Sequence, residues 1–163
     1  MKAKSPNDTK AELIVRMFPS DANPAGNVFG GEILKQIDLA AGLVAQRHAQ
    51  TNIVTASIDR VNFLKPVYVG NALIVSARLN YVSRSSMEIE IKVEAEDIAK
   101  NTRTLTGTAF VTAVALDKDG KPTPVPELVL VSDEERKKFA EGKTRMEQRA
   151  REYKLVKERA EHG

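Results

Sequence analysis

Hydrophobic side chains recur every three or four positions along residues 32–48, a spacing typical of an α-helix with one buried face. At 100° per residue these side chains fall in one arc about 140° wide. The arc consists of Ile33, Leu34, Ile37, Ala40, Ala41, Val44 and Ala45. Leu39 and Leu43 fall on the opposite, polar side, so we expect another subunit to cover part of that side.

The rest of the pattern alternates with a period of two, which is typical of strands. A first strand is predicted over residues 11–17, before a loop rich in Pro, Asn and Gly that ends at Gly31. Four further strands follow the helix, over residues 53–63, 73–81, 87–96 and 104–116. Because no helices separate these four, we expect a mainly antiparallel sheet with the apolar helix across one face.

The C-terminal part of the chain predicts a second helix. Ser132, with Glu135 three positions later, forms a capping-box pattern. Residues 132–163 carry 10 basic and 8 acidic side chains. We therefore expect a solvated helix that packs one side on the body and frays beyond about Arg151. The predicted organisation is a disordered or extended segment at 1–10, one α+β domain at 11–131, and the charged helix and tail at 132–163.

Composition excludes several kinds of chemistry. The 163 residues include no cysteine and two histidines, which removes disulfide scaffolds, zinc ribbons and cysteine nucleophiles, and we expect no metal site. Outside the C-terminal segment the chain has 15 basic and 14 acidic residues, so its net charge there is close to zero. Nucleic-acid binding is therefore not expected. No apolar run approaches the roughly 20 residues that span a bilayer. We expect a soluble, cytoplasmic protein that does not bind membranes.

Asp38 is the most informative polar residue, because its helical angle places it on the shoulder of the apolar arc. A carboxylate there would lose solvent, which disfavours its charged form. Buried carboxylates are uncommon unless they are paired or used in chemistry. The alternative is an aspartate at the helix edge that is exposed or hydrogen-bonded to a neighbouring chain.

Gly30 and Gly31 open the same helix, where free backbone N–H groups suit an anion or a developing oxyanion. Close packing of the loop on a strand is the alternative explanation. Asp38 lies about 10 Å further along the helix axis, so one carbonyl cannot easily touch both groups of one chain. Two antiparallel helices from paired subunits would bring them together, which predicts a site shared across a dimer interface.

The remaining polar candidates are weaker. His48 lies about 15 Å beyond Asp38 and within the apolar arc, so a satisfied, semi-buried histidine is the simpler interpretation. Ser85 and Ser86 have no nearby base, which disfavours serine catalysis. Together with Arg84 they could contact phosphate, although a solvated hairpin turn is the more common use of such residues.

Several segments, taken in order, resemble the acyl-CoA thioesterases of the hotdog fold, and in particular the cytosolic long-chain branch that includes the brain-type enzyme. The similarity runs from about residue 11 to about residue 151, and the ordered set is specific although no single piece is. The segments are residues 21–31 (DANPAGNVFGG), 33–34, 38–42 (DLAAG), 51–57 (TNIVTAS), 61–63 (VNF), 86–90 (SMEIE), 124–126 and 141–143.

The resemblance implies a five- or six-stranded antiparallel sheet wrapped around the helix, and dimers assembled as trimers of dimers. It also implies that Asp38 is the catalytic acid position, with Asn23, fifteen residues earlier, supplied by the facing subunit; Asn27 is a less suitable substitute. Asp38 would act as base or nucleophile, and the sequence does not choose between them. Backbone N–H groups near Gly30 and Gly31 would stabilise the oxyanion.

The implied function is hydrolysis of fatty acyl-CoA to a free fatty acid and CoA, with no cofactor beyond the CoA of substrate and product. The position of their hairpin, and not the resemblance, makes Arg84, Ser85 and Ser86 candidate contacts for coenzyme A. The main alternative is a non-catalytic acyl-CoA binding or sensing protein. An enoyl hydratase would need an Asp/His pair that this helix does not supply, and a purely structural oligomer would bind no CoA. The sequence does not determine the preferred chain length.

Overall fold

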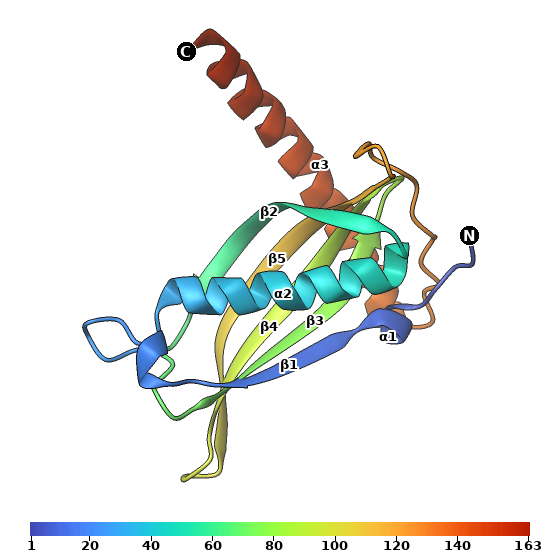
Figure 1. Ribbon diagram of the computed structural model, residues 1–163. Coiled ribbons are helices and arrows are strands. Elements are labelled where there is room, and N and C mark those ends of the chain that lie inside the picture. Colours follow the sequence, from blue (N-terminus) through green and yellow to red (C-terminus); the bar gives the residue numbers. More distant parts are fainter.

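The computed structural model describes residues 1–163, and its elements follow the predicted order (Figure 1). The predicted apolar helix and the five predicted strands are all present, with ends that differ from expectation by two residues or fewer. The elements are α1 (Pro6–Thr9), β1 (Ala11–Arg16), the 3-10 turn η1 (Pro19–Asp21), α2 (Gly30–Ala49), β2 (Asn52–Phe63), β3 (Ala72–Val82), β4 (Ser86–Asp97), β5 (Thr102–Leu116) and α3 (Asp133–His162).

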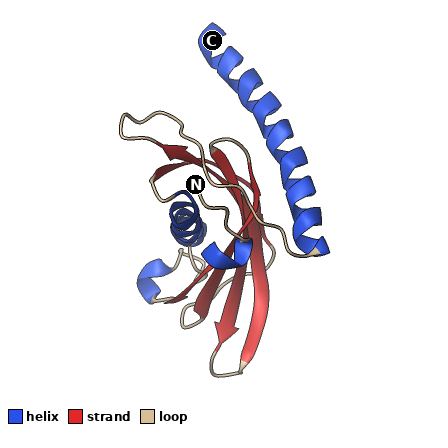
Figure 2. Ribbon diagram, turned by 90° about the vertical axis from the view of Figure 1, so that its right-hand side faces the viewer, coloured by secondary structure: helices blue, strands red, loops and turns tan.

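The five strands form one antiparallel sheet in the order β1-β3-β4-β5-β2, so β1 and β2 are its edges. The sheet curves around α2, and α3 lies on the opposite face (Figure 2). This arrangement confirms the predicted α+β architecture, an antiparallel sheet wrapped around one central helix. No helix of the molecule is long and apolar enough to cross a membrane.

The core forms where the apolar face of α2 meets the inward-facing residues of the strands. From α2, Ile37, Ala40 and Val44 are at most 1% exposed. The alternating residues of β4 supply the opposite side, because successive side chains of a strand point to opposite faces. Those inward residues are Met87, Ile89, Ile91, Val93 and Ala95. Leu39 and Leu43 remain exposed in the single subunit, as the pattern predicted.

His48 is the buried histidine that the sequence analysis predicted. It is 0% exposed, and its Nε2 lies 2.7 Å from the carbonyl oxygen of Pro126. Burial lowers the pKa of His48 below its usual 6.5, and the charge of Lys4 acts in the same direction, whereas the hydrogen bond to Pro126 opposes both. The folded protein therefore holds this imidazole in its neutral form.

We expect His48 to make the folded state less stable at mildly acidic pH. Because the unfolded chain takes up a proton near pH 6.5 and the folded chain does so only at lower pH, stability is complete above 6.5 and falls below it. The Tm should decrease from pH 7 to about pH 5.5, and His48→Gln should flatten that decrease. His162→Gln, in the exposed tail, is the control; an equal flattening there would contradict the assignment.

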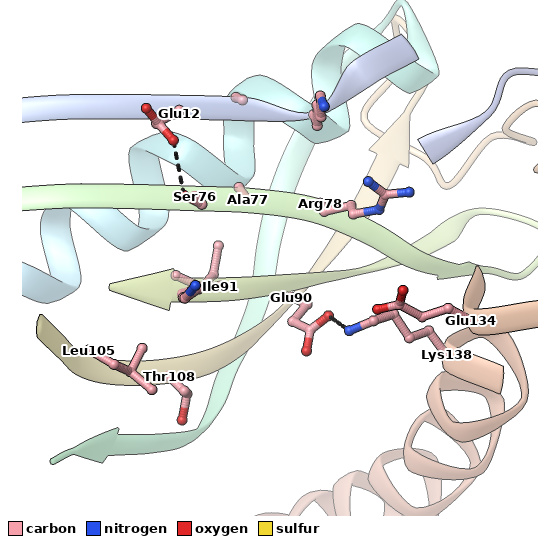
Figure 3. Close-up of a pocket in the computed structure, with 13 residues that line it drawn as sticks. Glu12, Ser76, Ala77, Arg78, Glu90, Ile91, Leu105, Thr108, Glu134 and Lys138 are labelled. Carbon is pink, nitrogen blue, oxygen red and sulfur yellow. Dashed lines mark hydrogen bonds and ion pairs between the residues drawn. The ribbon is translucent and has the colours of Figure 1, made fainter. Parts of the chain in front are cut away.

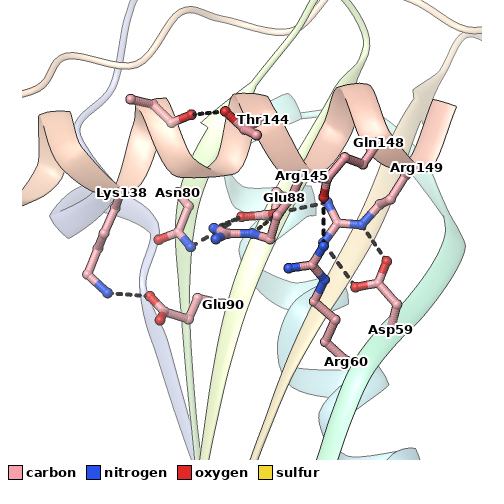
Figure 4. A network of polar contacts seen from close by, with 11 residues as sticks. Asp59, Arg60, Asn80, Glu88, Glu90, Lys138, Thr144, Arg145, Gln148 and Arg149 are labelled. Carbon is pink, nitrogen blue, oxygen red and sulfur yellow. Dashed lines mark hydrogen bonds and ion pairs between the residues drawn. The ribbon is translucent and has the colours of Figure 1, made fainter. Parts of the chain in front are cut away.

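The outer face of the sheet binds one side of α3, as predicted, and does so through charged side chains (Figure 4). Glu88 of β4 is 0% exposed and accepts hydrogen bonds from Arg145 and Arg149 of α3 at 2.6–3.0 Å. Arg149 also forms a bidentate ion pair with Asp59 of β2. The alternating glutamates of β4 resemble a solvent face in sequence, but α3 covers the first of them.

Three terminal features also differ from expectation. Residues 1–10, expected to be disordered or extended, include α1, whose Pro6 and Thr9 are buried. The helix α3 does not fray near Arg151 but continues to His162. At the start of α3 only half of the predicted capping box forms. The Glu135 carboxylate accepts instead from the Val131 N–H at 2.7 Å and from Arg78 at 2.6 Å. The carboxylate thus binds Arg78 of β3 in place of the N-cap backbone.

Candidate active site

Asn23 organises the loop that leads into α2. Its side-chain Oδ1 accepts the backbone N–H groups of Ala25 at 3.0 Å and Asn27 at 3.2 Å, so the loop turns tightly around it. The backbone of Asn23 also pairs with that of Asn27 at 2.7 Å. Because Oδ1 takes both backbone donors, the Nδ2 amide has no partner within the chain and is free to donate to a ligand.

Gly30 and Gly31 form the first turn of α2, as predicted. The N–H groups of Glu32 and Ile33 both donate to the carbonyl of Phe29, whereas those of Gly30 and Gly31 have no acceptor. A Cβ on Gly31 would come within 3.0 Å of the Phe29 ring, and one on Gly30 would lie 3.6 Å from Phe63. The start of α2 therefore lies beside the rings of Phe29 and Phe63, and a larger residue at position 31 would displace the Phe29 ring.

Asp38 projects from the middle of α2 towards the edge strand β2. The hydroxyl of Thr55 on β2 donates to Asp38 Oδ1 at 2.6 Å, which fixes the carboxylate against that edge. The expectation that Asp38 is desolvated is wrong for the single subunit, where the residue is exposed. Its helical angle does place it beyond the buried arc, but β2 has no neighbouring strand on its outer side to cover it.

No role for Thr55 follows from the hydrophobic pattern. The residue occurs within one of the segments that carry the family resemblance, and that is the only signal in the sequence. Its contact with Asp38 depends on α2 lying across β2, which only the fold reveals. Thr55 therefore joins Asp38 as a residue that can hold the carboxylate in one orientation.

One chain does not bring all the candidate residues together. Asn23 and Asp38 share no hydrogen bond, and Asp38 lies seven positions after Gly31 along the helix. The hairpin with Arg84, Ser85 and Ser86 joins β3 to β4 at the end of the sheet near the C-terminus of α2 (Figure 1). The hairpin and Gly31 therefore lie towards opposite ends of α2.

The hairpin itself is held by backbone contacts. The carbonyls of Arg84 and Ser85 accept from Val125 and Ala115, both at 2.9 Å. The N–H of Ser86 donates to the side chain of Ser83 at 3.3 Å. The Arg84 side chain is exposed and forms no hydrogen bond or ion pair within the chain, so it can meet an anion.

A pocket of about 720 Å³ lies away from these residues (Figure 3). It opens on the outer face of the sheet beside α3, and its lining mixes acids with bases, for example Glu90 with Lys138. None of the predicted site residues lines it. We therefore do not place the chemistry there. No group of three or more His, Cys, Asp or Glu side chains is arranged to hold a metal ion.

Comparison with known proteins gives consistent matches. The family model of the thioesterase superfamily matches residues 25–101. The cytosolic acyl coenzyme A thioester hydrolase of Rattus norvegicus is 43% identical over 139 residues, which cover 84% of this chain and 36% of the rat protein. An uncharacterised acyl-CoA thioester hydrolase of Bacillus subtilis is 40% identical over 128 residues, covering 78% of this chain and 74% of that protein. The chain thus spans about a third of the length of its first curated relatives.

Solved structures match nearly the whole chain. An acyl-CoA hydrolase of Bacillus cereus superposes with a TM-score of 0.91 at 34% identity, covering 98% of this chain and 97% of that one. The Staphylococcus aureus hydrolase, solved with butyryl coenzyme A and coenzyme A, gives 0.90 at 34% identity and 98% of both chains. A hexameric acyl-CoA thioesterase gives 0.88 at 34% identity, with 94% and 98% covered.

Three further structures of the Staphylococcus aureus hydrolase each carry one alanine substitution, of an aspartate, a threonine or an asparagine. They match with TM-scores of 0.90–0.91 at 32–33% identity, and at least 98% of each chain is covered. In that protein the asparagine precedes the aspartate by 15 residues and the threonine follows it by 17 residues. Asn23, Asp38 and Thr55 have the same residue types and the same separations.

Proposed function

We propose that this chain, which belongs to the thioesterase superfamily, hydrolyses acyl-CoA thioesters to free acids and coenzyme A. The observation that carries the proposal is the carboxylate of Asp38, held by Thr55 beside a free sheet edge. Structural relatives that match nearly the whole chain are acyl-CoA hydrolases, and one of them is solved with butyryl coenzyme A. The chain has their hotdog fold.

Asp38 supplies the reactive group in this proposal. As a general base it would take a proton from water while the hydroxide attacks the thioester carbonyl; as a nucleophile it would attack the carbonyl itself and form an anhydride that water then hydrolyses. In both cases the C–S bond breaks and CoA leaves as a thiolate. A thiol with a pKa of about 8.5 is a good leaving group, so no strong general acid is required.

A second copy of the chain completes the site. Asp38 lies beside β2, whose outer edge pairs with no strand, so a copy that pairs along this edge would cover the carboxylate and remove it from water. Antiparallel α2 helices would then place the Gly30 and Gly31 N–H groups and the free Asn23 amide of one copy near Asp38 of the other. The hexameric relative supports an assembly of such pairs as a trimer of dimers.

The finer substrate class in this proposal rests on the family resemblance, which the mammalian relatives support. The 43% identity to the rat cytosolic hydrolase supports membership of the brain-type cytosolic branch, with long-chain acyl-CoA as substrate and a cytoplasmic location. Arg84, with its unpaired guanidinium, would bind a phosphate of CoA together with Ser85 and Ser86, from a subunit other than the one that supplies Gly30. No cofactor or metal enters this scheme.

Release of CoA from a panel of acyl-CoA lengths, followed with a thiol reagent, tests the function. The proposal expects turnover that rises with chain length. The competing hypothesis, a non-catalytic acyl-CoA binding or sensing protein, expects binding of the same compounds with no release of thiol. Binding without turnover at every chain length would therefore decide for the alternative.

A further inference from the structure

One face of α3 continues beyond the sheet on which it packs. Phe139 meets the ring of Tyr81 with centroids 4.8 Å apart, Gly142 lies so close that a Cβ would be 2.8 Å from that of Tyr81, and Arg149 pairs with Asp59. These positions are spaced by three, four or seven residues and share one helix face. The same spacing leads to Tyr153, Val156 and Ala160.

The part of this helix face that carries Tyr153, Val156 and Ala160 has no partner within the chain. The last contacts of α3 with the sheet are Gln148 with Arg60 at 2.8 Å and Arg149 with Asp59, both on the edge strand β2. Every residue from Ala150 onwards is exposed, and Tyr153 and Val156 are 70% and 62% exposed. The helix therefore leaves the sheet at β2 and projects beyond it (Figures 1 and 2).

The length of the projecting segment, residues 151–162, suits a neighbouring sheet. Twelve helical residues extend about 18 Å, whereas strands lie about 4.8 Å apart, so the segment can cover three to four further strands. The edge that it crosses is the free edge of β2, twelve residues long. The other free edge, β1, has only six residues and lies on the far side of the sheet.

We infer that residues 151–162 bind the outer sheet face of a second copy of this chain, across paired β2 strands. This inference rests on the pairing of β2 edges proposed above. Such pairing continues the sheet, so the partner's outer face lies directly under the projecting segment. By two-fold symmetry each copy then binds the other through its α3. Both helices therefore stabilise the subunit interface along the paired β2 strands, which carries the two active sites.

The chemistry of the outer face fits the segment. Val54 of β2 alternates with Ile53 and Thr55, which face α2, so its side chain points outwards, and it is 44% exposed. Val114 of β5 is its cross-strand neighbour and faces the same way. The two valines form an apolar surface beside the subunit interface. Tyr153 and Val156 of the partner subunit supply apolar side chains to cover it.

Photo-crosslinking between distinguishable copies tests the contact. Tyr153 is replaced by p-benzoylphenylalanine in unlabelled protein, which is mixed with ¹⁵N-labelled chains until subunits exchange. The inference expects cross-linked peptides that join residue 153 of one copy to β2, β5 or α3 of the other. Cross-links confined to a single chain, the absence of any cross-link, or a monomeric protein would each overturn it.

A variant pair measures the strength of the contact. Burial of one large apolar side chain is worth more than a tenfold change in affinity. The double variant Tyr153→Glu with Val156→Glu should therefore raise the dissociation constant of the dimer at least about tenfold. Leu155 is also exposed, but it lies on the opposite face of α3, so Leu155→Glu should stay within about twofold. Equal effects of both changes would contradict the inference.

Hydrolysis of acyl-CoA by the same samples separates the two proposals. Cross-links between copies in a protein that releases no CoA would leave the α3 contact standing and reject the enzymatic function. Release of CoA by a protein without such cross-links would reject the α3 contact alone.

Discussion

Asp38→Asn is expected to lower kcat for acyl-CoA hydrolysis by about 10²–10⁴-fold, the range typical for loss of a general base. Asparagine has the shape of aspartate and can still accept the Thr55 hydroxyl, so the local geometry and the fold should persist. It can neither take a proton from water nor attack a thioester. The measurement is CoA release at saturating substrate, together with CoA binding, which should change little.

Asp119→Asn provides the matched control, because this aspartate lies in the exposed turn after β5 and is not one of the candidate site residues. It should retain the activity of the unchanged protein. If Asp38→Asn kept more than a tenth of that activity, neither the base nor the nucleophile role of Asp38 would be tenable.

Glu88→Ala is expected to lower the free energy of unfolding by about 3–5 kcal/mol, as is typical when one partner of a buried ion pair is removed. The change leaves Arg145 and Arg149 facing each other under α3 with Asp59 as the remaining anion. Arginine keeps its proton throughout the pH range in which proteins fold, so neither guanidinium can relieve the repulsion by losing a proton. Urea unfolding followed by circular dichroism measures the loss.

Glu90→Ala is the control for this stability prediction. Glu90 sits two residues away on the same face of β4 and pairs with Lys138 of α3, but it is about a third exposed. Pairs that water reaches contribute about 0–1 kcal/mol. Losses of equal size at the two positions would show that burial of Glu88 does not govern the attachment of α3.

The backbone architecture was predictable because each element carries its own local signal. Residues 32–48 have a period near 3.6 and the strands a period of two, so the helix, the five strands and their antiparallel arrangement all follow from the pattern. Gly30 and Gly31 do open α2, and His48 is buried. These features depend on neighbours in the chain.

Features that depend on distant contacts were not predictable in the same way. Glu88 alternates with apolar residues just as a solvated glutamate would, and only the approach of α3 buries it. The contact between Thr55 and Asp38 joins residues on different elements. Asp38 is exposed in the single chain because no strand lies beyond β2, and its angle on α2 could not reveal that. Its desolvation by a second copy belongs to the proposal.

Activity of mixed subunits tests the shared site most directly. Asn23→Ala and Asp38→Ala chains, each nearly inactive alone, are mixed under conditions where exchange is verified by mass. In an equal mixture about half of the dimers are mixed, and each mixed dimer has one intact site out of two. About a quarter of the activity of the unchanged protein should therefore return. Verified mixed dimers that recover no activity would contradict a site built from two copies.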